Sequence, residues 1–303
     1  MLARVAPVAF ALAVAACGKT RAVDAEAAAA TFDRITLETG GVHGLSGLAV
    51  DGAGALWTVA ERGRAAFRVE LDGGRVASIA RVPVEGVPDG EDLEAIGVAG
   101  GDRFWVGTEG RQAGVARVYA LRHDGAALRV IETAELTAAD TELAIGANHG
   151  AEGLCVAGDQ VVVAIETAAK GPDRWAPVVT LTPGQPRVLH RLHLTTATGK
   201  LSGLDCWRDG EVVRAIAIER HFEVTRVLAF DLPPTGGDII PSVLIDLAPV
   251  LRGALNLEGI ARLPDGRVVA VVDNQYDRIT GPDELLVLRP DRLAGPARSA
   301  AGR

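Results

Sequence analysis

The chain lacks several features that mark common classes of protein. Its 303 residues carry a net charge of −8 and no block of Lys and Arg, so we exclude nucleic acid as the main partner. Its three cysteines form no Cys-x-x-Cys motif and no Cys/His spacing of the kind that binds zinc. Ser46 and Ser202 stand in Ser-Gly-Leu and not in the Gly-x-Ser-x-Gly turn of α/β-hydrolases. The sequence therefore offers none of these three kinds of site.

The N-terminus has the pattern of an export signal. A short basic start, Met1–Arg4, precedes an apolar run, Val5–Ala16, that is too short to remain as a membrane-spanning helix. The small residues before Cys17 resemble the lipobox of a bacterial lipoprotein, which implies cleavage before Cys17 and its lipidation. An ordinary secretory signal cut near Ala16 is the alternative. Gly18 in place of Asp favours the outer membrane, by resemblance to the sorting rules of enteric bacteria.

A repeated unit fills most of the remaining chain. Each copy opens on a short motif, passes through a Gly/Asp turn and enters a second apolar strand that ends on an acid. The opening motifs are Leu-Ser-Gly-Leu at 45–48, Leu-Glu-Ala-Ile at 93–96, Ala-Glu-Gly-Leu at 151–154, Leu-Ser-Gly-Leu at 201–204 and Leu-Glu-Gly-Ile at 257–260. The closing acids are Glu61, Glu109, Glu166, Glu219 and Asp273. A strand-rich period near 50 residues predicts a β-propeller.

The repeats predict an all-β fold with five blades. The fifth repeat lacks a fourth strand, and the strand expected at 31–38 can supply it by pairing with 284–289, which closes the ring. Six blades is the alternative count, although no stretch of 40–50 residues is left over for it. We expect a signal peptide at 1–17, a tether at 18–30, the propeller at 31–290 and a flexible tail at 291–303.

The repeat pattern also bears on the two cysteines of the mature chain, Cys155 and Cys206. Cys155 follows Glu152 by three residues and Cys206 follows Ser202 by four, so they lie on opposite faces of neighbouring first strands. This is the arrangement that a bridge between stacked blades needs, and export to an oxidising compartment permits it. Two separate buried thiols fit the sequence equally well.

The ends of the repeated strands bring acids to one rim. The first strand of a blade begins where the antiparallel second strand ends, so the opening Glu94, Glu152 and Glu258 join the five closing acids. Such a cluster needs a neutralising partner. Carboxylates and amides suit calcium, with the ligands Glu152, Glu258, Asp273, Asn148, Asn256 and Glu94. Ion pairs with Arg62, Arg111 and Arg220 that hold the blades in register are the alternative.

Three histidines are expected at the same rim. His43 and His149 each precede the opening residue of their repeat by three positions, and His221 follows Glu219-Arg220. A histidine beside carboxylates can act as a general acid or base, and His149 is the candidate for that role. Arg62 and Arg220 are candidates for holding an anionic group of a substrate. A loop histidine that only donates a hydrogen bond is the alternative for each.

The order of these motifs resembles the phytase-like family described as "esterase-like activity of phytase". The resemblance covers about 45–277 and rests on LSGLAV…LWTVAERG, DLEAIGV…FWVGTEG, NHGAEGLCV…VVVAIET, LSGLDC…AIERHF and NLEGIARLPDGRVVAVVDNQYD. The family commonly has Asp-Arg-Gly where this chain has Glu61-Arg62-Gly63, and an Asp-Asn-Asn-Phe-like run where it has Asp273–Asp277. Both differences keep an acid in place. The resemblance implies a propeller with ester-hydrolysing chemistry, and the architecture is similar to calcium-dependent lactonases.

The sequence therefore predicts a monomeric, exported propeller, lipid-anchored at the cell envelope with the outer membrane favoured. Its acidic centre would use Ca2+ to hydrolyse a small anionic or ester substrate, which could be a phosphoester, a carboxylic ester or a lactone. The alternative is a non-enzymatic binding propeller in which calcium is structural, because a fold does not decide a function.

Overall fold

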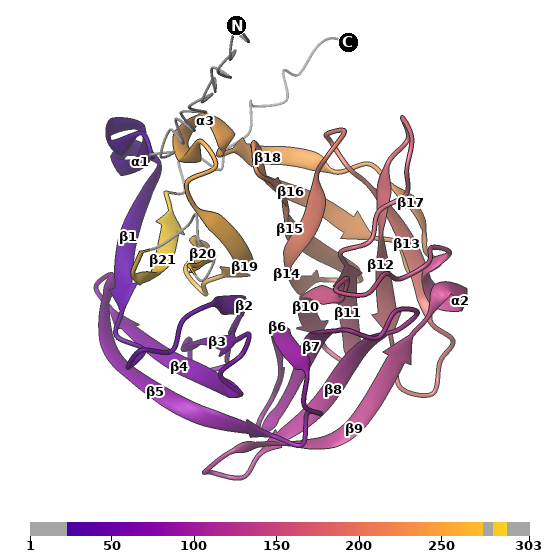
Figure 1. The fold of residues 1–303 in the computed structure, drawn as a ribbon, viewed down its shortest axis with the longest axis horizontal. Helices are drawn as coiled ribbons and strands as arrows, with labels where there is room; N and C mark the ends of the chain where they lie inside the picture. Colours follow the sequence, from indigo (N-terminus) through magenta and orange to yellow (C-terminus); the bar gives the residue numbers. More distant parts are fainter. Residues whose placement is uncertain (1–22, 275–280, 290–303) are drawn as a thin grey trace, which may run out of the picture.

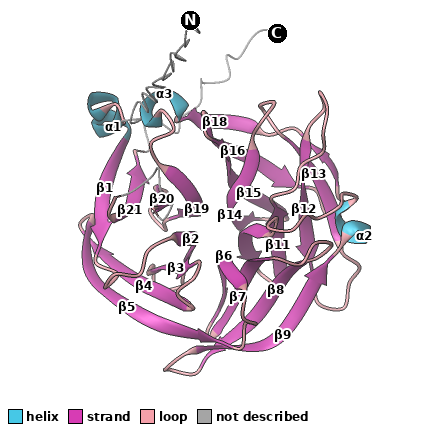
Figure 2. Ribbon diagram, in the orientation of Figure 1, coloured by secondary structure: helices cyan, strands magenta, loops and turns pink. Residues whose placement is uncertain are grey.

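Twenty-one strands and three short helices make up the part of the chain that the computed structural model describes, residues 23–274 and 281–289. The expectations for the signal peptide, for lipidation of Cys17 and for the tail at 291–303 concern residues outside these ranges. Figure 1 shows the strands arranged in sheets around a centre, and Figure 2 shows how little helix there is. The fold is all-β and of the propeller type.

The first two repeats form one sheet of eight strands. Its order is β2 (Leu45–Val50), β3 (Leu56–Ala60), β4 (Ala65–Asp72), β5 (Arg75–Glu85), β9 (Leu128–Leu136), β8 (Ala116–His123), β7 (Arg103–Gly110) and β6 (Glu91–Gly100). The two halves meet at their outer strands, where β5 and β9 run parallel for two residue pairs. Every other neighbouring pair in this sheet is antiparallel, as expected for four-stranded meanders joined only at an outer edge.

The third and fourth repeats form the next two sheets. The third comprises β10 (Ala151–Ala157), β11 (Gln160–Ile165), β12 (Trp175–Leu181) and β13 (Val188–His193), and the fourth comprises β14 (Lys200–Asp209), β15 (Val212–His221), β16 (Val224–Leu232) and β18 (Ser242–Asp246). A short strand from the fourth repeat, β17 (Gly237–Ile239), crosses over and pairs in parallel with β13. The sequence did not predict this crossover. It ties the outer edges of the two sheets together.

The last sheet combines the two ends of the chain. It contains β19 (Asn256–Arg262), β20 (Val268–Asp273), β21 (Asp283–Leu288) and the N-terminal strand β1 (Phe32–Leu37). β1 runs antiparallel to β21, from the pair Phe32–Leu288 to the pair Leu37–Asp283. This is the pairing that the incomplete fifth repeat predicts.

Part of the expected tether is helical. Helix α1 (Ala25–Thr31) begins at Asp24, whose carboxylate accepts a hydrogen bond from the backbone amide of Ala27 at 3.1 Å. The Asp24 amide donates to the carbonyl of Val250 at 3.0 Å, beside helix α3 (Ala248–Leu251). Helix α2 (Ala138–Thr141) lies in the long connection between the second and third repeats. Among the described residues, no helix has the length and apolar character needed to cross a bilayer.

The first strands of the five repeats surround the centre. β2 contacts β6, β6 contacts β10, β10 contacts β14, β14 contacts β19, and β19 contacts β2. Glycine at the third position of the opening motif permits this approach. A Cβ atom on Gly259 would lie 2.5 Å from the carbonyl carbon of Gly47, and one on Gly47 would lie 2.7 Å from Cα of Ala95. Side chains at these positions would force the strands apart.

The polar residue of the opening motif lies in a β-bulge. The pairing of the first and second strands skips Glu94, Glu152, Ser202 and Glu258, so these residues have no partner across the ladder. A bulge of this kind re-aims a side chain and is common beside functional sites. The bulges therefore explain how a polar side chain can be accommodated within strands whose other residues are almost all buried and apolar.

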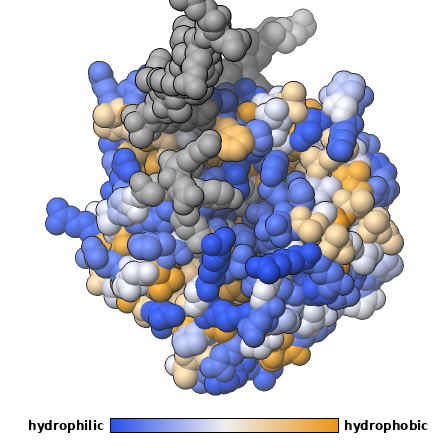
Figure 3. All heavy atoms as spheres, viewed as in Figure 1, coloured by the Kyte–Doolittle hydropathy of each residue, from blue (hydrophilic) through white to orange (hydrophobic). Residues whose placement is uncertain are grey.

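A disulfide joins Cys155 on β10 to Cys206 on β14, with Cα atoms 5.6 Å apart. Both residues belong to the apolar cluster between the third and fourth sheets. The bridge therefore links two sheets that share no ladder. Figure 3 shows that hydrophilic side chains predominate on the face seen there, with apolar residues in small separate groups.

Candidate functional site

Three carboxylates from adjacent sheets meet at the rim. Glu109 lies near the end of β7, Glu152 is the bulged residue of β10, and Glu166 directly follows β11. One oxygen from each lies within 4.8 Å of one oxygen from each of the others. We call these three residues the carboxylate trio. Their spacing is suitable for sharing one cation.

Two glycines allow the trio to form. A Cβ atom on Gly107 of β7 would lie 2.4 Å from the carbonyl oxygen of Ala151, and one on Gly150 would lie 2.4 Å from the carbonyl oxygen of Thr108. The ends of β7 and β10 therefore approach more closely than side chains would allow. The amide of Glu166 then donates to the carbonyl of Gly150 at 3.2 Å, which holds the third acid beside the other two.

Glu152 is the least satisfied member of the trio. Its residue is 4% exposed, and its Oε1 atom is buried without a hydrogen-bond partner in the described structure. Burying an unpaired carboxylate oxygen is costly unless the group is protonated or binds a cation. The all-oxygen donor set of the trio is of the kind that calcium prefers. The residues present therefore fit the metal that the sequence suggested.

A second acidic group lies on β19 and β20. Asn256 donates hydrogen bonds to Glu258 at 2.7 Å and to Asp273 at 2.9 Å. Arg220 forms an ion pair with Glu258, with Nε 3.1 Å from Oε2. This part of the rim matches the alternative that the sequence left open, in which arginine neutralises an acid of the neighbouring sheet.

Burial and mutual repulsion raise the pKa values of the rim acids. For Glu94 and Glu152 the pKa lies well above its ordinary value, first because of burial and then because of neighbouring carboxylates. Burial, followed by repulsion from Asp273 and Glu258, raises the pKa of Glu61 to about 9. Burial raises the pKa of Glu258 to about 7, although the Arg220 guanidinium opposes the shift. Binding of a cation by these raised carboxyl groups would therefore compete with protons.

His149 lies beside the trio. Its Nδ1 atom is 3.1 Å from the carbonyl oxygen of Ala147, so Nδ1–H donates there when that nitrogen carries the hydrogen. The other ring nitrogen, Nε2, is 3.8 Å from Oε2 of Glu166. Gly146 packs against the ring, since a Cβ atom there would lie 2.6 Å from Nδ1. The structure therefore places a half-exposed imidazole at the edge of the trio, with Nε2 directed toward Glu166.

The other predicted residues have more varied positions. Asn148 is exposed, and its backbone N–H donates a hydrogen bond to the carbonyl of Gly110. The side chain of Arg62 is 72% exposed, and its Nε atom lies 3.8 Å from Oδ2 of Asp92. The Nδ1 atom of His43 lies 3.3 Å from Oδ2 of Asp283. Asp283 belongs to β21 in the last sheet, which supplies no member of the trio. Burial, followed by the positive charges of Lys200, Arg220 and Arg174, lowers the pKa of His221.

Three rim residues have structural roles. Glu219 is fully buried and accepts hydrogen bonds from the amides of Thr195 and Thr196, each at 3.0 Å. The hydroxyl of Ser46 donates to the carbonyl of Glu94 at 2.6 Å, and that of Ser202 donates to the carbonyl of Leu257 at 2.8 Å. The two serines therefore link neighbouring first strands, as their place at the strand ends suggested.

Sequence reasoning placed Glu109 and Glu166 at the rim but did not select them as ligands. It also missed Lys200, whose Nζ is 2.5 Å from Oε1 of Glu166. The signal for both acids was present, because each ends the second strand of its repeat. What the sequence could not show is which of five equivalent strand ends converge with Glu152.

The raised pKa values predict how stability depends on pH. A carboxyl group whose pKa is higher in the folded state contributes stability that is fully present below its unfolded pKa and is lost as pH rises through the folded pKa. With folded values of about 7 for Glu258 and about 9 for Glu61, the metal-free protein should lose stability between about pH 5 and about pH 9. Thermal melting in chelator across this range tests the sign. Glu61→Gln should flatten the slope, and a melting temperature that rises with pH would contradict the expectation.

An all-β propeller with an acidic centre is the class of protein that the fold and the rim define. Residues 40–276 match the phytase-like family described as "esterase-like activity of phytase", and the chain belongs to that family. No functionally curated protein matches the chain.

Solved structures are similar to this chain at low identity. A luciferin-regenerating enzyme is 11% identical with a TM-score of 0.50, and the match covers 86% of this chain and 96% of that one. The PQQ-bound aldose sugar dehydrogenase from Streptomyces coelicolor is 14% identical with a TM-score of 0.47, and the match covers 85% and 98% of the two chains. At these identities the likeness concerns the fold and does not extend to the reaction.

Proposed function

We propose that this protein is a five-bladed propeller, closed by β1, with a calcium-dependent ester-hydrolysing site at the centre of its acidic rim. The observation that carries the proposal is the carboxylate trio, in which a buried oxygen of Glu152 has no hydrogen-bond partner. The contacts among the five first strands and the β1–β21 pairing support the blade count. Family membership supports hydrolysis of a phosphoester, a carboxylic ester or a lactone.

Glu109, Glu152 and Glu166 would hold the cation. Glu94, which lies within electrostatic range of Glu152 and Glu109, and Asn148, whose backbone contacts Gly110, are further candidates. Glu258, Asp273 and Asn256, which were also predicted as ligands, form a separate hydrogen-bonded group. A bound calcium ion would supply Lewis acidity toward the ester oxygen and would offset the charge of the trio.

His149 would take up or deliver a proton through Nε2, which faces Glu166. The contact from Nδ1 to the carbonyl of Ala147 would keep the ring oriented. Lys200 would hold Glu166 in place through its ion pair. Arg220 is engaged with Glu258, so it would stabilise the rim more than it would bind substrate, and exposed Arg62 would be the freer of the two predicted anion-binding residues.

A panel of 4-nitrophenyl esters, lactones and phosphomonoesters, assayed with calcium and with chelator, tests this function. Hydrolysis should require calcium. His149→Gln should lower kcat by about a hundredfold, the lower range for loss of a general acid or base, without lowering the melting temperature. His123→Gln, a histidine on β8 outside the rim, is the matched control. Turnover that is unaffected by chelator and by His149→Gln would exclude the proposed site.

The second candidate is a binding propeller in which the cation is structural. The network of Asn256, Glu258, Asp273 and Arg220 favours it, because Arg220 neutralises Glu258, Asn256 donates to both acids, and the two acids are buried. Calcium-dependent stability with no turnover across the whole panel would support this function.

We also propose that the protein is an exported monomer, lipid-anchored through Cys17 at the cell envelope with the outer membrane favoured. The support is the sequence pattern of residues 1–17 and the disulfide, which suits an oxidising compartment. Cys17→Ser should move the protein from the membrane fraction to the soluble fraction, since the acyl chains would be its attachment. A variant that still sediments with membranes would contradict the anchor.

A further inference from the structure

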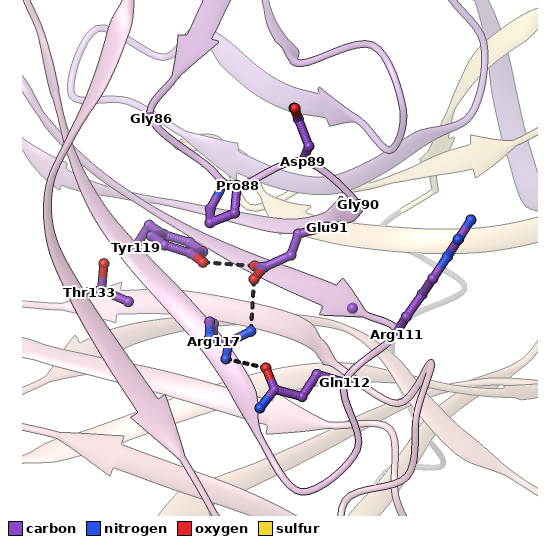
Figure 4. A pocket seen from close by; sticks show the side chains of 11 residues that line it. Gly86, Pro88, Asp89, Gly90, Glu91, Arg111, Gln112, Arg117, Tyr119 and Thr133 are labelled. Atoms are coloured by element: carbon purple, nitrogen blue, oxygen red, sulfur yellow. Dashed lines mark hydrogen bonds and ion pairs between the residues drawn. The ribbon is translucent and has the colours of Figure 1, made fainter.

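A cleft of about 700 Å³ opens at the end of β7 that also carries Glu109. Two short segments line it, the loop at 86–90 between β5 and β6 and residues 110–112 after β7, together with side chains of β8 (Figure 4). Gly110 and Arg111 directly follow Glu109 in the chain, whereas the wall residue Glu91, which pairs with Gly110, is on the opposite face of the sheet from Glu109. Its volume is within the range of sites that bind small molecules.

The inner wall of the cleft is a hydrogen-bonded network centred on Glu91. This carboxylate accepts from Tyr119 at 2.8 Å and from Thr108 at 2.7 Å, and it pairs with Arg117 at 2.8 Å. Arg117 also donates to Gln112 at 2.8 Å (Figure 4). Arg117 also pairs with Glu135 at 2.8 Å, so its guanidinium is held by two carboxylates and is not free for a ligand.

Arg111 differs in this respect from Arg62, Arg64 and Arg117. These three pair with Asp92, with Asp89, and with Glu91 and Glu135, respectively. No carboxylate within residues 23–274 and 281–289 pairs with Arg111, which lines the cleft and is exposed. Figure 4 shows its side chain extending away from the Glu91 network.

The unpaired guanidinium sets the character of the cleft. Asp89 is the one other charged residue at the mouth, and it lies 3.2 Å from Arg64. Of the two arginines that line the cleft, Arg111 is therefore the one without a carboxylate partner among the described residues. Guanidinium groups bind carboxylate and phosphate oxygens through paired hydrogen bonds. A neutral acyl or alkyl group would gain nothing from Arg111.

We propose that Arg111 is a specificity-determining residue that binds an anionic group of the substrate, a carboxylate or phosphate, within this cleft, while the reacting ester lies at the carboxylate trio. This inference rests on the proposed function for the reaction and adds the substrate class. The preferred substrate is an ester that carries a second, non-reacting oxyanion group.

Two esters of similar size test the inference. Mono-4-nitrophenyl succinate carries a free carboxylate, and 4-nitrophenyl butanoate does not. Arg111→Gln should raise KM for the succinate ester about tenfold, the effect of losing one charge-assisted pair, and should leave kcat and the butanoate ester unchanged. Arg103→Gln is the matched control, because Arg103 is also exposed but begins β7 at the opposite end of the strand. It should alter neither ester.

Binding without turnover separates this inference from the reaction. Calorimetric titration with succinate and with inorganic phosphate should show binding to the wild-type protein that Arg111→Gln abolishes, and the tighter of the two identifies the oxyanion. If the protein hydrolyses neither ester but binds an oxyanion through Arg111, the proposed reaction fails and the anion site stands. If both esters are hydrolysed and Arg111→Gln changes neither KM nor oxyanion binding, the reaction stands and the inference is overturned.

Discussion

Calcium should raise the melting temperature of the metal-free protein, and Glu152→Gln should remove most of that response. A ligand that binds only the folded state stabilises it by about 2.7 kcal/mol at a hundredfold excess over its Kd. Glu152 supplies the buried unpaired oxygen, and its carboxylate lies between Glu109 and Glu166. Replacing it with an amide removes one ligand charge and the repulsion that raises its pKa. The metal-free variant should therefore melt at or above the wild-type temperature.

The control for this experiment is Glu132→Gln, which removes an exposed acid from β9, away from the rim. It should leave the calcium response unchanged. Glu109→Gln and Glu166→Gln should weaken the response as Glu152→Gln does. Glu258→Gln distinguishes the two acidic groups. Glu258 forms its ion pair with Arg220 in the group on β19 and β20, and it is not a member of the trio. Equal calcium responses of the wild type and Glu152→Gln would exclude the trio as the calcium site.

The repeated motif predicted the fold well because its information is local. Each opening motif places one polar residue and one small residue at a fixed point of a first strand, and five such strands lie around the centre. The incomplete fifth repeat predicted the pairing of β1 with β21 for the same reason. The alternation of apolar residues can be read directly from the sequence, and it also shows where each strand ends.

The site was harder to predict because it depends on the stagger between sheets. Glu109 and Glu219 occupy equivalent positions in the sequence, yet Glu109 joins the trio and Glu219 is held by Thr195 and Thr196. The difference comes from the loop before β14, whose hydrogen bonds are not visible in a strand pattern. The bulge at Glu152 is also a property of the pairing register and not of the residue itself.

The crossover of β17 shows a further limit. Residues 237–239 belong to the fourth repeat by sequence but pair with β13 of the third. Their three residues carry no alternation that could assign them to either sheet, so only packing decides. Helix α1 in the expected tether has a similar origin, because the Asp24 ion pair with Arg252 and the contact with Val250 lie far along the chain.

Removing the disulfide should have the largest effect on stability. Cys155 and Cys206 are 51 residues apart, and closing a loop of that length is expected to disfavour the unfolded chain by about 4 kcal/mol. The bridge joins β10 to β14, which belong to different sheets. The double variant Cys155→Ala with Cys206→Ala should therefore unfold at a lower urea concentration, with a free energy of unfolding reduced by about that amount. Alanine is preferred to serine because both positions are buried among apolar residues.

A reductant separates the bridge from the packing of the two side chains. Dithiothreitol should lower the urea midpoint of the wild-type protein toward that of the double variant and should leave the double variant unchanged. The single variant Cys206→Ala already lacks the bridge, so it should resemble the double variant and not the wild type. If the reduced wild type and the oxidised wild type unfold at the same urea concentration, the bridge does not constrain the unfolded chain. The contacts between β10 and β14 would then hold the third and fourth sheets together on their own.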